Sequence, residues 1–506
     1  MDYGRFSWNN APITRVPAAL TIVRWSLPIA KFRLRQLTCS GERRKLRLYE
    51  FPTTACRIPE LNTDFALHRS LAAPSSFTGS GASRWSKTIA DRYRLELSDE
   101  LVDWFDGGVC DQVSVGDFCE PATPHQLILE TPDCIWPGFM PPDVLPLVGN
   151  GIGDWLCGRV TADNRIGEII YWYHGGGDYL PYGNGLAEAI FFDTLAERLP
   201  GRRQFHAVPA YREPSEYQSM VSGPLVAWAK THLPSSSHSV LAIDAPPSLV
   251  ASKLRSHGIA PVALTCDAVL AALDTTLRMR MTVAEANALN VSWERDAAKW
   301  MFDTSLIPAE KRSWLMARWH DADESLFDQD WDAVQSGCKS IADSRDDLGW
   351  VNDCLGWCAQ RRGDFETAKA HYQRSAVASI FSDQAVRFRT HFDSDRVAKF
   401  SVARLMEMGA DHGLDAEYVA AISDVSDPNW RARVSDHWSG KANGDHVRPE
   451  QRYELMFRAG WDVGCNSMQR YHELLVSMAD AAGQSSQFAR AEVARTHAAC
   501  IATRFG

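Results

Sequence analysis

The sequence predicts an α+β domain over residues 89–205, followed by an all-α domain over residues 281–506. Two observations predict this division. Up to about residue 200, short β-prone runs bounded by turn residues alternate with helical segments. From about residue 282 the strand signals fade, and helical periodicity continues to the end of the chain. A length of 506 residues, which is too great for one hydrophobic core, agrees with at least two domains.

The composition disfavours several classes of protein. Apolar residues make up 45% and charged residues 23%, which is typical of a globular protein. The net charge of −10 disfavours general nucleic-acid binding, because no overall basic field exists to neutralise phosphates, and it suits the binding of a basic protein. No stretch approaches eighteen consecutive apolar residues, so we expect a cytoplasmic protein that does not cross a membrane.

Residues 1–88 are predicted to be a basic, poorly ordered extension and linker. Residues 1–60 contain eleven Lys or Arg and four acidic residues, and prolines interrupt any amphipathic period. A run of small and polar residues over 72–83 follows. A transit peptide and a nucleic-acid-binding arm remain open, but the prolines favour an extension without stable order or translated sequence upstream of the true start.

The α+β domain is predicted to open with a short helix from Leu97 to Phe105, which Ser98 caps. Next, β-prone runs at residues 155–160 and 166–173 flank an Asp-Asn turn and predict a β-hairpin. A second helix is expected over residues 185–199, with Asn184 as its cap.

Residues 206–280 are predicted to be a βαβα extension or linker between the two domains. The expected strands are residues 239–243 and 259–264, and the expected helices are residues 247–256 and 267–277. A helix between two strands of one sheet places them parallel. Whether this unit extends the preceding sheet or forms a small subdomain stays open.

Two motifs that resemble ligand sites are incomplete. The glycines of residues 149–154 lead into a strand rather than a helix, and position 154 is Asp, so we expect a turn rather than a nucleotide site. The acidic run over residues 321–332 has Leu326 where a calcium loop needs glycine. No CxxC pair occurs. We therefore expect no cofactor and no metal.

The sequence His174-Gly175-Gly176-Gly177 follows a strand, as the oxyanion loop of α/β-hydrolases does. No serine after position 177 lies in a G-x-S-x-G frame, so no nucleophile accompanies it. We expect no catalytic residues and no enzymatic activity. A hydrolase that uses the His174 loop, with Asp178 as an acid/base partner, is the weaker alternative.

Four blocks in the α+β domain, residues 97–108, 145–156, 169–174 and 187–195, resemble in order and spacing the SUKH superfamily of Smi/Knr-type cell-wall-assembly regulators. The central block, in which Leu145-Pro146 is followed by a glycine-rich turn that ends in Gly153-Asp154 and leads into a strand, is the most specific. The resemblance implies an α+β domain that binds other proteins and has no shared catalytic residues. In bacteria it implies an immunity protein that neutralises a toxin domain, and in fungi a regulatory scaffold.

Residues 355–375 resemble one tetratricopeptide (TPR) unit, a pair of antiparallel helices. The residues that carry the resemblance are Leu355, Gly356, Ala359, Gly363, Asp364, Phe365, Ala368, Tyr372 and Ser375. Ile380 stands where the usual closing proline would be, and residues 484–499 are a weaker second match. TPR-like packing implies a second surface for partners, whereas a generic helical bundle is the alternative.

We therefore expect a non-catalytic protein-binding module whose partner is a protein, in the immunity interpretation a toxin domain. A host scaffold is the alternative with no toxin connection. The residues expected to face the partner lie around the end of the predicted hairpin, where polar and aromatic side chains gather. They are Asp154, Trp172, Tyr173, His174 and Asp178.

Overall fold

The computed structural model describes residues 84–112, 114, 116–199, 214–242, 245–273, 277–320, 324–382, 397–409 and 413–506. The contacts of the chain divide it into two units, residues 1–76 and 77–506, and all described residues belong to the second. The predicted extension lies outside the described residues except at its end, where helix α2 (Trp85–Tyr93) begins. Ile89 and Tyr93 of α2 are fully buried, so the folded region begins before residue 89.

Five antiparallel strands form one sheet in sequential order. They are β1 (Glu120–Pro121), β2 (Val144–Gly149), β3 (Trp155–Val160), β4 (Ile166–Trp172) and β5 (Tyr179–Gly183). The predicted hairpin is β3–β4, in which Trp155 pairs with Trp172. Pro146 is tolerated in β2 because the short β1 pairs only with Val148 and Gly149.

One face of the sheet packs against the helices that precede residue 260. They are α2, α3 (Asp99–Asp106), α4 (Pro124–Leu127), α5 (Leu186–Ala196), α7 (Pro214–Val221), α8 (Pro224–Thr231) and α9 (Pro247–Ser256). The α3 helix is capped as predicted, because the Ser98 side chain accepts a hydrogen bond from the Leu101 amide. The predicted cap of α5 is wrong: Gly185 occupies that position, and the Asn184 amide donates to Glu188.

The two strands predicted over residues 206–280 are wrong. Residues 239–241 belong to a 3₁₀ helix, η2 (Ser235–Leu241), and residues 261–264 open α10 (Pro261–Leu273). For the strand predicted over residues 259–264, the reason lies in the burial of α10. Leu264 packs into one hydrophobic core, whereas Val269 packs into the other. A helix buried on two sides is apolar around its circumference, so its sequence lacks the contrast that identifies a helix.

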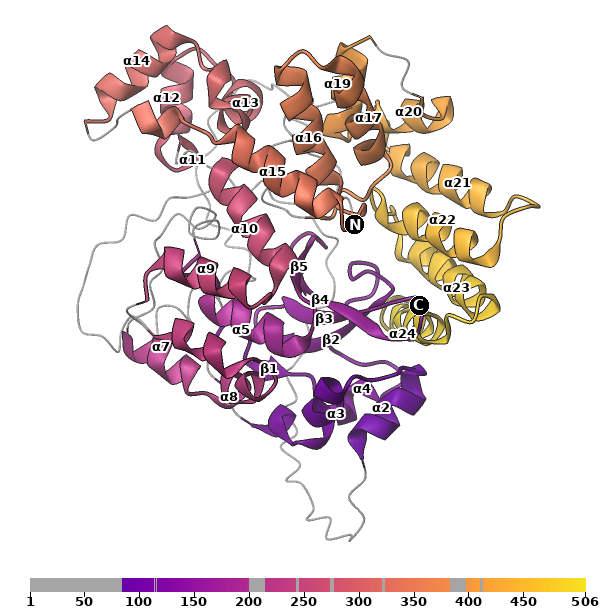
Figure 1. The fold of residues 1–506 in the computed structure, drawn as a ribbon. Helices are drawn as coiled ribbons and strands as arrows, with labels where there is room; N and C mark the ends of the chain where they lie inside the picture. Colours follow the sequence, from indigo (N-terminus) through magenta and orange to yellow (C-terminus); the bar gives the residue numbers. More distant parts are fainter. Residues whose placement is uncertain are drawn as a thin grey trace, which may run out of the picture. The chain divides into compact units, whose positions relative to one another are not determined.

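The helical region predicted from residue 281 is confirmed for the described residues. Its helices are α12 (Val283–Ala288), α13 (Ala298–Phe302), α14 (Ala309–Arg318), α15 (Trp331–Ala342), α16 (Gly349–Arg361), α17 (Phe365–Ala376), α19 (Phe400–Glu407), α20 (Ala416–Ile422), α21 (Trp430–Ala442), α22 (Pro449–Trp461), α23 (Met468–Gln484) and α24 (Phe488–Phe505), preceded by the short α11 (Leu277–Arg280). From α15 on, most consecutive helices pack against one another, and they form an arc that ends with α24 beside the sheet (Figure 1). None of the helices in the described part of the chain combines the length and apolar character that a membrane span requires.

The pair α16–α17 has the helix–turn–helix form that the TPR-like motif predicts. Gly363 makes the turn with a positive φ of 77°, and Asp364 caps α17 by accepting a hydrogen bond from the Thr367 amide. The two helices approach closely at Gly356, where an added Cβ would lie 2.4 Å from the Tyr372 ring. Only glycine permits this contact.

The concave side of the arc is filled by the second face of the sheet. Ile170 and Trp172 of β4 share a hydrophobic core with Val269 of α10 and Cys354 of α16. At the far end of the arc, the fully buried His497 of α24 places its Nε2 3.2 Å from a carbonyl oxygen of β2. The two regions distinguished in the sequence therefore share a core.

An ionic network reinforces this junction. Arg159 of β3 contacts Asp347 at 2.7 Å, and Arg345 contacts Asp347 and Glu168, at 2.7 and 2.8 Å. Burial works to raise the pKa of Asp347, but hydrogen bonds and attraction from the two arginines lower it well below its usual range. A half-buried carboxylate that is paired in this way stays charged and links the sheet to the helical arc.

Buried polar groups also lie where α16, α17 and α19 meet. Asp353 accepts a 2.6 Å hydrogen bond from Ser375, and Lys399 pairs with Asp462 nearby. Asp353 and Lys399 line a cavity of about 30 Å³, which is large enough for one or two water molecules. Burial raises the pKa of Asp353 to about 7, against the lowering effect of Ser375 and Lys399.

The substitution Gly356→Ala is expected to destabilise the protein by about 1–3 kcal/mol, because the added Cβ collides with Tyr372. Urea denaturation followed by tryptophan fluorescence measures this change. Gly440→Ala in α21 is the matched control, because a Cβ there meets open space, and it should be neutral or stabilising by up to about 1 kcal/mol. Equal stability of the two variants would contradict the close approach of α16 and α17.

The substitution Asp353→Asn is expected to change how stability depends on pH. The pKa of Asp353 is about 7 in the folded protein and 3.8 as a reference value for the unfolded chain. The contribution of protonated Asp353 is therefore complete below about pH 4 and is lost as the pH rises through about 7. The wild type should lose about 3 kcal/mol relative to Asp353→Asn over this range.

The free energy of unfolding of both proteins, measured by urea denaturation at several pH values, tests this expectation. The exposed Asp346, changed to Asn, is the control and should leave the pH dependence unaltered. Parallel curves for the wild type and Asp353→Asn would show that Asp353 titrates normally.

Candidate functional site

Two loops meet at one end of the sheet. The β2–β3 loop covers residues 150–154 and the β4–β5 loop covers residues 173–178; they are adjacent because Trp155 pairs with Trp172. In the first loop, the Asn150 side chain accepts hydrogen bonds from the amides of Ile152 and Asp154, at 3.1 and 3.0 Å. The glycine-rich segment thus makes a turn into a strand, as predicted, and the amides of Asn150, Ile152 and Asp154 are used within the loop.

Asp154 joins the two loops. Its Oδ1 lies 2.8 Å from His174 Nδ1 and accepts the His174 amide at 3.0 Å. Its Oδ2 accepts hydrogen bonds from the Tyr171 hydroxyl and the Asn150 amide group, at 3.2 and 3.0 Å. Burial works to raise the pKa of Asp154, but the hydrogen bonds and the charge of His174 outweigh it and lower the pKa. Asp154 is therefore an ionised anchor beneath the surface.

His174 is the polar group that this anchor presents to solvent. Its side chain is 39% exposed, and its ring packs 5.9 Å from that of Trp136. Gly153 also lies close to the ring, since an added Cβ would lie 2.8 Å from His174 Cγ. Because Nδ1 contacts Asp154, Nε2 is the ring nitrogen that can form a hydrogen bond with a bound molecule.

Two of the five residues predicted to face a partner are fully buried. Trp172 lies in the core between the sheet and the helical arc, and Asp178 has no exposed surface. Strand geometry explains Trp172, because neighbouring side chains of β4 point to opposite faces. Tyr173 is half-buried and its ring is stacked 4.1 Å from that of Tyr171. In the weaker alternative His174 would pair with Asp178, but the carboxylate beside the His174 ring is that of Asp154.

The structure adds two residues to this site. Trp136 is 39% exposed and its ring lies beside that of His174, and Ile152 is 59% exposed in the neighbouring β2–β3 loop. We call Trp136, Ile152, Tyr173 and His174 the loop-end patch. Ile152 stood inside the glycine-rich motif, and Trp136 inside a proline-rich stretch, so neither had a periodic pattern that would mark it. Exposed apolar side chains on loops held by a rigid sheet are typical of binding surfaces.

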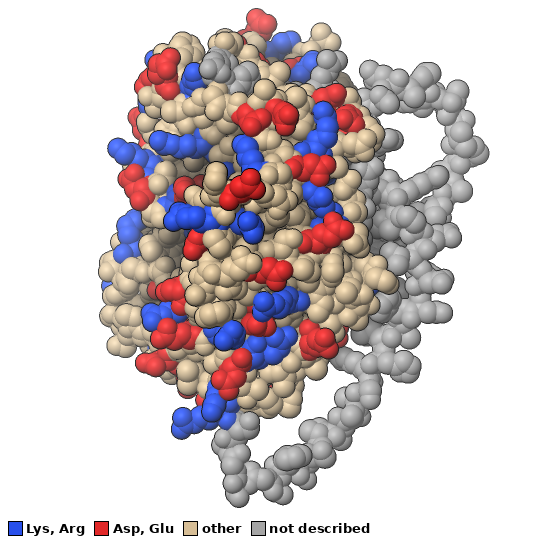
Figure 2. All heavy atoms as spheres, turned by 90° about the vertical axis from the view of Figure 1, so that its right-hand side faces the viewer, with Lys and Arg blue, Asp and Glu red and all other residues tan. Residues whose placement is uncertain are grey.

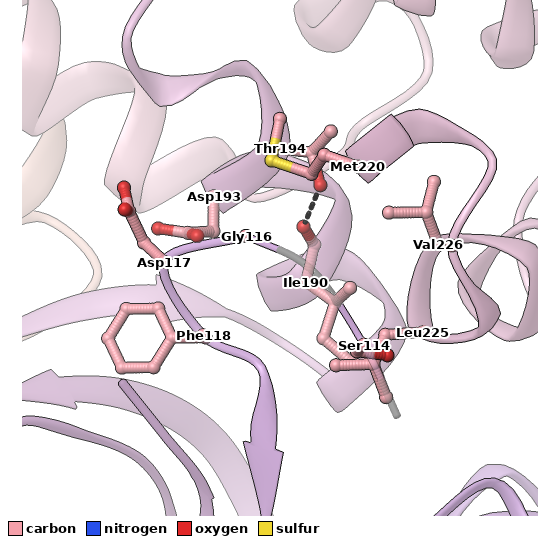
Figure 3. A pocket seen from close by; sticks show the side chains of 11 residues that line it. Ser114, Gly116, Asp117, Phe118, Ile190, Asp193, Thr194, Met220, Leu225 and Val226 are labelled. Carbon is pink, nitrogen blue, oxygen red and sulfur yellow. Dashed lines mark hydrogen bonds between the residues drawn. The ribbon is translucent and has the colours of Figure 1, made fainter. Parts of the chain in front are cut away.

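A second candidate, a pocket lined by the segment before β1, by α5 and by the α7–α8 region, is too small to be a ligand site. Figure 3 shows the carboxyl groups of Asp117 and Asp193 on one side of it, while the Thr194 hydroxyl donates to the carbonyl oxygen of Ile190 at 2.8 Å. Its volume of about 10 Å³ is at the limit for a single water molecule. This pocket cannot hold a metabolite.

Comparisons with known proteins find no relative. No family model matches the chain, no curated protein matches it, and no solved structure matches it. The SUKH-like and TPR-like interpretations therefore remain predictions from the sequence.

The anchor at Asp154 predicts an uncommon form of neutral His174, with the proton on Nδ1 and the lone pair on Nε2. Nitrogen-15 NMR of the imidazole, recorded above the pH at which histidines titrate, measures this tautomer. In Asp154→Ala the proton should move to Nε2, as in the exposed control His446, because the carboxylate acceptor is gone. An Nε2-protonated His174 in the wild type would contradict the arrangement.

Proposed function

We propose that this chain is a non-catalytic protein-binding module and that the loop-end patch contacts its partner. The observation that carries the proposal is that the anchored His174 lies against the exposed Trp136, with the exposed Ile152 in the neighbouring β2–β3 loop. An aromatic and an aliphatic side chain around one oriented polar group is a usual composition for the centre of a protein interface.

The SUKH-like interpretation supports the same proposal. The four blocks that carry the resemblance fall on α3, on β2 with its following turn, on β4 and on α5. Ile152, Tyr173 and His174 of the patch lie on the loops that follow β2 and β4, which the central and third blocks enter. In this interpretation the partner is a toxin domain that the chain neutralises, and a host scaffold is the alternative with the same surface.

Short-range contacts, rather than a charge field, would provide the recognition. On the face shown in Figure 2, Lys and Arg side chains are interspersed with Asp and Glu. A mixed surface of this kind gives little long-range steering. The affinity would then depend on the few apolar side chains of the patch.

The substitution Ile152→Asp is expected to weaken partner binding by about tenfold or more, because it places a charge in the centre of the apolar contact. The partner is first isolated by co-purification from the native host and identified by mass spectrometry. Its affinity for each variant is then measured by calorimetry. Leu249→Asp in α9 is the matched control, since Leu249 is 43% exposed but lies outside the patch. A wild-type affinity in Ile152→Asp would exclude the patch.

The identity of the partner separates the two biological interpretations. A partner that arrests growth when it is expressed alone, and does not when it is co-expressed with this chain, supports the immunity interpretation. A hydrolase that uses His174 would give a different pattern. The His174–Asp154 pair favours that alternative, and a hydrolytic activity that His174→Ala abolishes, with partner binding unaffected by Ile152→Asp, would establish it.

A further inference from the structure

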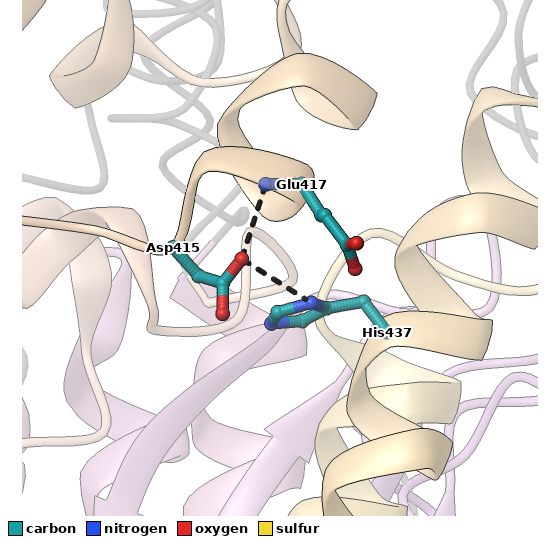
Figure 4. Close-up of side chains that lie close together, drawn as sticks. All are labelled: Asp415, Glu417 and His437. Atoms are coloured by element: carbon teal, nitrogen blue, oxygen red, sulfur yellow. Dashed lines mark hydrogen bonds and ion pairs between the residues drawn. The ribbon is translucent and has the colours of Figure 1, made fainter.

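A second group of ligating side chains lies in the helical arc, where α20 meets α21 (Figure 4). Asp415 is the N-cap of α20, Glu417 is in the first turn of that helix, and His437 is in α21. One ligating atom from each of the three side chains lies within 4.8 Å of the others. The group is separate from the loop-end patch and shares no residue with it.

His437 is the unusual member of this group. Its side chain is only 6% exposed, yet its Nε2 is buried without a hydrogen-bond partner among the described residues. Nδ1 faces Asp415 Oδ1 at 4.0 Å, which is beyond hydrogen-bond distance. A buried polar ring without a partner is costly, and the neutral ring is the form that binds metals.

The two carboxylates are placed to complete a site. Glu417 is exposed, and its carboxylate forms no hydrogen bond with the described residues. Asp415 uses Oδ1 to accept the Glu417 amide at 3.0 Å, and its Oδ2 lies 3.5 Å from Lys441 Nζ. The Lys441 ammonium thus already occupies the position of a cation beside Asp415.

We propose that Asp415, Glu417 and His437 bind a divalent transition-metal ion such as Zn²⁺. One imidazole nitrogen and two carboxylate oxygens form a donor set that suits these ions. In a tetrahedral site with bonds of about 2.0 Å, the ligand atoms lie about 3.3 Å apart. The three atoms now lie within 4.8 Å of one another, so side-chain movements of about 1 Å would close the group around the ion. The ion displaces the Lys441 ammonium, leaves its remaining positions to water and links α20 to α21.

Titration of the full chain with Co²⁺, followed by its visible d–d absorption, tests this proposal. We expect saturable binding that Zn²⁺ reverses, without the intense near-ultraviolet band of cobalt–thiolate bonds. Glu417→Gln should weaken Co²⁺ binding by about tenfold or more through the loss of a ligand. Glu450→Gln is the matched control, an exposed glutamate in the first turn of α22, and it should bind as the wild type does.

Two further variants make the test decisive. His437→Ala should also weaken binding, and Lys441→Met should tighten it several-fold, because the competing ammonium is removed. Glu417 is exposed, so Glu417→Gln keeps the test valid even if His437→Ala does not fold. The proposal is overturned if the wild type binds no Co²⁺ at millimolar concentration, if Glu417→Gln binds as tightly as the wild type, or if Lys441→Met binds more weakly.

Discussion

Successive side chains of β4 point into two different cores, Tyr171 toward α5 and Trp172 toward the helical arc. Because apolar side chains lie on both faces of the sheet, both faces must be covered by other parts of the chain. The helices before residue 260 cover one face, and the later helices curve around the other until α24 returns to β2. The arginine–carboxylate network at Arg159 and Arg345 links the sheet to the arc.

The same alternation decides which residues reach the candidate binding site. Trp172 is buried in the core between the sheet and the helical arc. The surface at this end of the sheet is therefore built from the loops that follow the strands. Asp154, held by four hydrogen-bonding groups, fixes the position of His174. The exposed Trp136 and Ile152 are then presented on a rigid support, which reduces the entropy lost when a partner binds.

Local signals in the sequence predicted a substantial part of this structure. Ser98 and the acidic residues after it identified α3, the turn at Asp163 identified the hairpin, and Gly363 identified the α16–α17 pair. Prediction failed where burial is two-sided. The apolar run that opens α10 was assigned to a strand, because a helix enclosed by two cores has no polar face.

The sequence by itself determined the elements whose signals lie within a few residues: caps, tight turns and one-sided periodicities. It also singled out His174. Only the tertiary structure decided that Asp154 rather than Asp178 anchors His174, that Trp172 is buried, and that Asp415 meets His437 across two helices. Such contacts join positions far apart along the chain, and pairing across strands and helices has no local pattern in the sequence that encodes it.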